Sequence, residues 1–123
     1  MKLICFVSLM LLMSGCYYDN GETLYPQLND TCDVSNVTWA GTVKPILSSN
    51  CLACHSAASA GGSGGGIRLE NYADVKTAVN NQKLFESISH SSGYSPMPKG
   101  GTKLNSCALQ QIKKWIDNGA PEN

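Results

Sequence analysis

Apolar residues in the C-terminal part of the chain recur at the three- and four-residue spacing of an amphipathic helix. The stripe consists of Leu109, Ile112 and Ile116, with Trp115 beside it. Asn105 or Ser106 can cap the start of this helix, and Gly119 and Pro121 end it. This is the clearest helix that the pattern predicts.

A second helix is predicted from Thr42 to about Asn50. Thr42 is a possible N-cap, and Pro45 lies in the first turn, where its missing N–H removes no hydrogen bond. The apolar face of this helix would consist of Trp39, Val43, Ile46 and Leu47. Two shorter helices are predicted around residues 73–79 and 83–89.

The segment Ala57–Gly66 consists of alanine, serine and glycine only. This composition holds no regular element and lacks the spacing of a phosphate-binding loop, so we expect a flexible connection. No alternating apolar pattern of useful strand length occurs in the sequence. The pattern therefore predicts an all-α fold of about three to five short helices joined by long loops.

The N-terminal residues form a short apolar run behind one positive charge, Lys2. The run from Leu3 to Met13 is much shorter than the roughly 20 residues that span a bilayer. We interpret residues 1–15 as a signal peptide, with a buried N-terminal helix as the alternative.

Residues 12–16, with the sequence LMSGC, resemble the lipobox of bacterial lipoproteins. The resemblance implies that Cys16 is lipidated and becomes the N-terminus, with residues 16–36 as a lipidated tether. Ordinary cleavage that leaves a free thiol is the alternative. We therefore expect an exported protein, lipid-anchored to the inner or outer bacterial membrane, with its domain in the periplasm or at the cell surface.

The chain has 123 residues and no net charge. This length suits one domain, and the charge provides no basic surface for nucleic acid. Of the six cysteines, Cys5 would leave with the signal peptide and Cys16 would carry lipid. The four that remain would lie in an oxidising compartment. They are Cys32, Cys51, Cys54 and Cys107.

Residues 51–55 have the sequence CLACH, the attachment motif of c-type haem. Cys51 and Cys54 are spaced to reach the two vinyl groups of one porphyrin edge as thioethers. His55 can then bind the iron. The predicted cofactor is one covalent haem c.

Three other interpretations of this motif remain open. A zinc site would need further ligands, which only Cys107 or His90 could supply. A thioredoxin-like dithiol would need a βαβ context. Cys51 and Cys54 could also form a structural disulfide.

Met97 is the one methionine outside the predicted signal peptide and is the predicted second iron ligand. A proline on each side of Met97 restricts the backbone there. His90 is the alternative distal ligand. A His55/His90 pair would lower the reduction potential relative to His55/Met97.

Cys32 and Cys107 are the cysteines left after the lipid and haem sites are assigned. In an oxidising compartment they are predicted to form a disulfide between the start of the domain and the first turn of the last helix. The chain-entropy model gives such a long loop a stabilisation of around 4 kcal/mol.

Several motifs in this order resemble the class I c-type cytochrome domain, as found in bacterial lipoproteins. They are VKPIL at 43–47, CLACH at 51–55, MPKGG at 97–101, Leu104, and IKKWIDNGA at 112–120. The resemblance covers roughly residues 37–120 and assigns residues 37–123 to a monohaem cytochrome c domain.

The resemblance implies a small cytochrome c-like fold whose N- and C-terminal helices cross near one covalent haem. Cys51 and Cys54 would attach the haem, and His55 and Met97 would be its axial ligands. Many family members have a proline soon after the haem-binding histidine, whose carbonyl orients the imidazole. Residues 56–66 contain no proline, so the partner of the His55 ring is not identified.

A haem with both axial positions filled by the protein has no open position for a substrate. We therefore expect an electron carrier rather than an enzyme: a monomer that exchanges single electrons with redox protein partners and does not bind nucleic acid. One alternative is a labile distal ligand, which would make the protein a gas or peroxide sensor or enzyme. Another is a haem module of a larger oxidoreductase complex.

Overall fold

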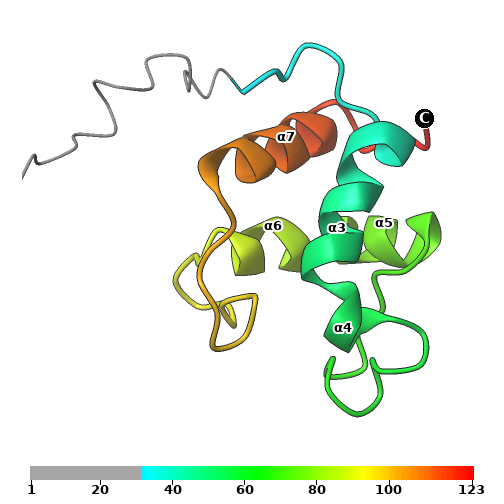
Figure 1. The fold of residues 1–123 in the computed structure, drawn as a ribbon, viewed down its shortest axis with the longest axis vertical. Helices are drawn as coiled ribbons and strands as arrows, with labels where there is room; N and C mark the ends of the chain where they lie inside the picture. The colour runs from blue at the N-terminus through cyan, green and yellow to red at the C-terminus, as the bar shows by residue number, and fades with distance from the viewer. Residues whose placement is uncertain (1–31) are drawn as a thin grey trace, which may run out of the picture. The chain divides into compact units, whose positions relative to one another are not determined.

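The computed structural model describes residues 32–123. The predicted signal peptide, the predicted lipidation site at Cys16 and most of the predicted tether lie outside the described residues. The described part contains one π-helical turn, five α-helices and no strand, which confirms the all-α class there (Figure 1). The elements are η1 (Trp39–Val43), α3 (Lys44–Asn50), α4 (Leu52–His55), α5 (Tyr72–Asn80), α6 (Lys83–Ile88) and α7 (Ser106–Asp117). None of these helices is long and apolar enough to cross a membrane.

The first helical segment begins earlier than predicted because a π-helical turn, η1, precedes α3. Thr38, not Thr42, is the N-cap, and its side-chain oxygen accepts from the backbone N–H of Gly41 at 3.0 Å. The Thr42 hydroxyl oxygen instead lies 3.4 Å from the backbone nitrogen of Thr38, which donates to it. Pro45 lies in the first turn of α3, as predicted.

Helix α7 follows the predicted pattern closely. Its cap is Asn105, whose side chain accepts from the backbone N–H of Ala108 at 2.8 Å. The buried side chains of α7 are those of Ala108, Ile112 and Trp115, with Leu109 and Ile116 partly buried. Gly119 follows the helix with a φ of +87°, a conformation that glycine adopts at low cost.

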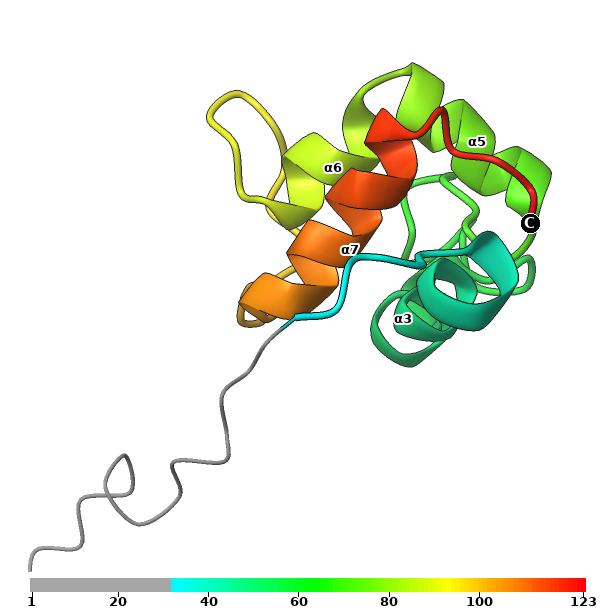
Figure 2. The same ribbon diagram turned by 90° about the horizontal axis from the view of Figure 1, so that it is seen from above.

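The core is centred on an aromatic contact between the first and last helical segments. The ring of Trp39 in η1 stacks on that of Trp115 in α7 at a centroid distance of 5.7 Å, and Tyr72 of α5 meets Trp39 edge-on at 5.6 Å. Such aromatic pairs add stability beyond their buried area. Helix α7 also contacts α6, beside which it lies in Figure 2.

The C-terminal tail returns to the start of η1. The backbone carbonyl and side-chain oxygens of Asn123 accept from the N–H groups of Ala40 and Trp39, each at 2.8 Å. The hydroxyl of Tyr72 donates to the backbone oxygen of Ala120 at 2.9 Å. The tail therefore satisfies N–H groups that the first helical turn leaves free.

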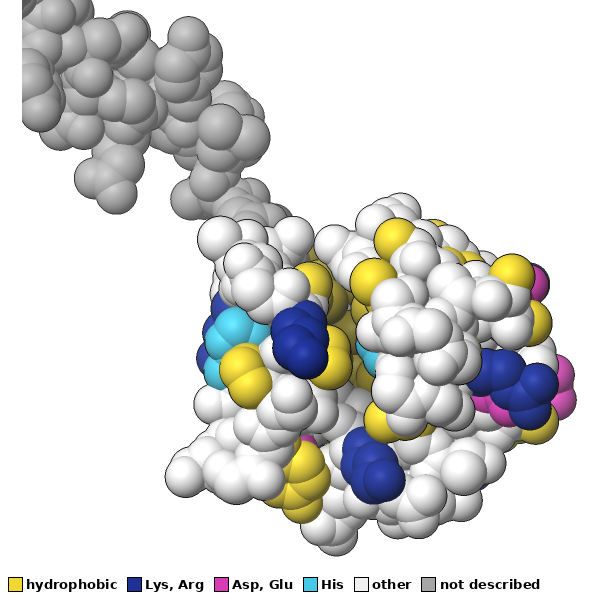
Figure 3. All heavy atoms as spheres, turned by 90° about the horizontal axis from the view of Figure 1, so that it is seen from below, with side chains coloured by type: hydrophobic (Ala, Val, Ile, Leu, Met, Phe, Trp, Pro, Cys, Tyr) yellow, Lys and Arg dark blue, Asp and Glu magenta, His cyan; other side chains and the backbone are white. Residues whose placement is uncertain are grey.

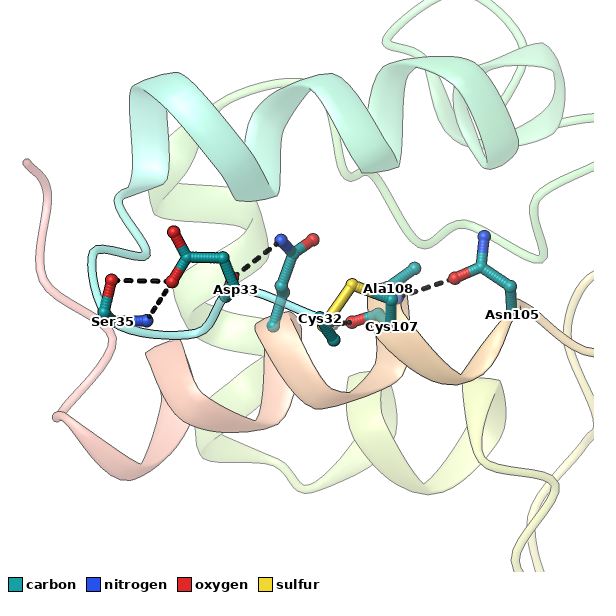
Figure 4. The surroundings of a disulfide bond; sticks show 7 residues. Cys32, Asp33, Ser35, Asn105, Cys107 and Ala108 are labelled. Atoms are coloured by element: carbon teal, nitrogen blue, oxygen red, sulfur yellow. Dashed lines mark hydrogen bonds between the residues drawn. A yellow bond between two sulfur atoms is a disulfide. The ribbon is translucent and has the colours of Figure 1, made fainter. Parts of the chain in front are cut away.

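Cys32 and Cys107 lie at disulfide distance, with sulfur atoms 2.12 Å apart and Cα atoms 5.1 Å apart (Figure 4). This is the pair that the cysteine count predicts. Nearby, the side-chain amide of Gln111 donates to the backbone oxygen of Asp33 at 3.2 Å. These contacts extend the packed region to Cys32, ahead of the predicted domain start at residue 37.

Candidate cofactor site

A cavity of about 780 Å³ lies between two parts of the domain. Residues of α4 and the Gly-rich loop after it form one wall, and residues of α6 and the segment 93–99 form the other. Figure 3 shows this hollow, with hydrophobic side chains and a histidine inside it. Its volume falls within the range of about 300–1,000 Å³ that is typical of cofactor sites.

The CLACH motif forms one wall through a single helical turn. The backbone N–H groups of Cys54 and His55 both donate to the carbonyl of Cys51, at 3.1 and 2.9 Å. Residues three and four apart lie on one side of a helix, and all three residues line the cavity. The thiols of Cys51 and Cys54 are free, and Cys51 is partly buried while Cys54 is exposed.

Three observations concern the other interpretations of this motif. Because the two thiols are free, they form no structural disulfide here. Burial raises the pKa of the Cys51 thiol to about 11, whereas a redox-active thiol needs a lowered pKa. Cys107 is paired with Cys32, and residues 32–123 hold no group of three or more His, Cys, Asp or Glu side chains placed to bind a metal.

The His55 imidazole is held by the backbone of the next loop. Its Nδ1 lies 2.8 Å from the carbonyl oxygen of Ile67. Because a carbonyl oxygen only accepts, Nδ1 carries the proton and Nε2 keeps its lone pair for a metal. His55 is the only buried polar or charged side chain in the part of the chain that the structure describes.

The loop that supplies this carbonyl is the Gly-rich segment. As predicted, it contains no helix or strand, and it consists of consecutive hydrogen-bonded turns. Just after it, the N–H of Leu69 donates to the carbonyl oxygen of His55 at 2.9 Å. Gly64 is the residue at which this loop comes close to the CLACH motif. A Cβ there would lie 2.5 Å from the carbonyl oxygen of Cys54 and 3.1 Å from Nδ1 of His55. The absent side chain lets the loop close against the motif.

Met97, in the segment 93–99, is partly buried and also lines the cavity. Its N–H donates to the backbone oxygen of Ser87 at 3.0 Å. Its own carbonyl lies 2.9 Å from Nε2 of His90. His90 is exposed and is not among the residues that line the cavity. The structure therefore brings Met97, and not His90, to the cavity that holds His55.

Two residues that shape this site are not indicated by any sequence motif. Ile67 acts through its backbone, twelve positions from His55, and Gly64 acts through its lack of a side chain. Neither role depends on a side-chain type that a motif could specify. Gly64 is one of five glycines in its loop, so composition alone does not single it out.

The charged side chains that line the cavity are cationic. Among residues 32–123, Lys83 and Lys99 line it, and no carboxylate side chain does. The remaining lining includes the apolar residues Leu84, Ile88 and Leu104. Two thiols, an imidazole and a thioether around an apolar cavity with a cationic edge form a donor set that fits haem c and its two propionates.

Comparison of the chain with protein-family models, with curated proteins and with solved structures gives no match.

Proposed function

We propose that this protein is a monohaem c-type cytochrome that transfers single electrons between redox partners. Cys51 and Cys54 would hold the haem as thioethers, and His55 and Met97 would bind its iron. The observation that supports this most is that all four side chains line one cavity, although Met97 is far from the motif in the sequence. The cytochrome c-like arrangement of the helices is part of the same proposal.

When bound, haem c supplies a reversible one-electron couple between ferrous and ferric iron. The Ile67 carbonyl fixes the His55 tautomer, so that Nε2 is the ligand atom. Leu84, Ile88 and Leu104 make the cavity apolar, and an apolar wall limits access of water.

A carrier fits this site better than an enzyme. His55 and Met97 both line the cavity, so in this proposal the protein would supply both iron ligands itself and leave no position for a substrate. As part of the proposal, Cys16 carries the lipid that anchors the protein to a bacterial membrane. The domain then meets its redox protein partners as a monomer in the periplasm or at the cell surface.

The test is an absorption spectrum of the purified mature protein, oxidised and reduced, produced in a host that attaches c-type haem. We expect a c-type spectrum that survives denaturation of the chain, because thioether bonds are covalent. We also expect the weak far-red ferric band of methionine-ligated haem. A Cys51→Ser/Cys54→Ser variant is the control and should lose the covalent haem. Wild-type protein without covalent haem would refute the proposal.

Carbon monoxide binding separates the alternatives. The reduced wild-type protein should not bind CO, whereas Met97→Ala should, because its distal position is open. CO binding by the wild type would favour the sensor or enzyme with a labile ligand. An oxidoreductase that stably co-purifies with the protein would favour the alternative in which this domain is the haem module of a larger complex.

A further inference from the structure

Helix α6 ends in a conformation that histidine seldom adopts. The N–H of Ser91 donates to the carbonyl of Glu86 at 2.9 Å, and that of His90 donates to Ser87 at 3.2 Å. These bonds form a Schellman motif, in which the left-handed position is usually glycine. Here that position is His90, with a φ of +59°.

The side chain of His90 reaches the backbone of Met97. Its Nε2 lies 2.9 Å from the Met97 carbonyl oxygen, and since that oxygen only accepts, Nε2 is the donor. The N–H of the same residue donates to Ser87 at 3.0 Å. The end of α6 therefore holds both backbone polar groups of Met97.

These two bonds are the main polar attachment of a long irregular segment. Between residues 92 and 104, all of which the structure describes, Met97 is the only residue that hydrogen-bonds to Ser87 or His90. The other backbone bonds there, from Tyr94 to Ser91 and from Gly101 to Pro98, are local. Apart from the packing of its side chain against the core, Met97 is therefore held by this one attachment.

We propose that His90 is a positioning residue that holds Met97 at the cavity, rather than a rival iron ligand. The proposal rests on the proposed function, since it concerns the same haem site. Loss of the imidazole would leave the haem attached but make the bond from the Met97 sulfur to iron easier to displace.

The test compares wild type, His90→Gly and Gln82→Gly as haem-loaded proteins. Glycine keeps the left-handed backbone at residue 90, so His90→Gly removes the imidazole without unfolding the end of the helix. Gln82 is a matched control, because it is exposed, has a φ of +58° and lies at the other end of α6.

The measurement is the affinity of the ferric protein for added imidazole, followed by loss of the far-red band. Removal of one hydrogen bond typically shifts an equilibrium roughly fivefold, so His90→Gly should bind imidazole about that much more tightly. Gln82→Gly should behave as wild type, and all three should retain covalent haem.

Equal imidazole affinity in His90→Gly and wild type would overturn the proposal. So would a wild type that lacks the far-red band and becomes high-spin in His90→Gly, because His90 would then be the ligand. Failure of the proposed function has a different signature, which is wild-type protein without covalent haem.

Discussion

At the scale of single residues, the site is held by a backbone oxygen and by a missing side chain. The Ile67 carbonyl oxygen lies 2.8 Å from Nδ1 of His55, and the Gly64 backbone lies so close to Cys54 that a Cβ would not fit. The CLACH motif and the lone Met97 identify side chains that could bind haem, because thiol, imidazole and thioether chemistry is visible in a sequence. The backbone oxygen of Ile67 and the missing side chain of Gly64 are not visible in this way. They become part of the site only when the loop folds back on His55.

Gly64→Ala tests how tightly this loop must close. The new Cβ would overlap the Cys54 carbonyl oxygen, and overpacking of this kind costs about 1–3 kcal/mol. We expect a lower melting temperature and less haem per chain, measured by thermal unfolding and by absorbance. Gly61→Ala is the control, since a Cβ there meets nothing within 4 Å. Equal effects of the two substitutions would contradict this role for Gly64.

At the scale of helices, apolar spacing predicts that a helix is present more reliably than it predicts the residues at which the helix begins and ends. The predicted helix at 73–79 is α5 at Tyr72–Asn80, and the one at 83–89 is α6 at Lys83–Ile88. Helix α4 was not predicted, because its four residues are too few to show a period. The start of the first helix was misplaced because two threonines, Thr38 and Thr42, both suit an N-cap.

Thr38→Ala tests the observed cap. The Thr38 side chain accepts a hydrogen bond at 3.0 Å, and loss of a threonine cap costs about 1 kcal/mol. Thr42→Ala should cost less, because the bond that its oxygen accepts is longer, at 3.4 Å. Chemical denaturation of both variants measures the difference. A larger loss in Thr42→Ala would restore Thr42 as the cap.

At the scale of the whole molecule, the helical class follows from the sequence, but the way the helices meet does not. Stacking of Trp39 on Trp115 and the return of Asn123 to η1 join residues at opposite ends of the described chain. Local patterns carry no signal for such contacts. The cytochrome c-like arrangement of the helices therefore stays a prediction from the resemblance. The absorption spectrum tests the covalent haem that the same resemblance implies.

The disulfide is the covalent link at this scale. With a sequence separation of 75 between the two cysteines, the chain-entropy model gives a stabilisation of about 4 kcal/mol. The Cys32→Ser/Cys107→Ser variant should lose about this much in guanidinium denaturation and keep its haem spectrum, since neither cysteine lines the cavity. An unchanged denaturation midpoint would mean that the two thiols are not bonded in the mature protein.

The same bond also determines how the domain bears a mechanical load. Cys51, Cys54, His55 and Met97 all lie within the loop that the Cys32–Cys107 bond closes. A pull between the chain ahead of Cys32 and the C-terminal tail passes through the two sulfur atoms directly into α7. The covalent path then bypasses residues 33–106. If the proposed lipid anchor holds the chain, tension would load α7 and the contacts between the tail and η1, while the four residues of the proposed haem site lie outside the covalent path of the force.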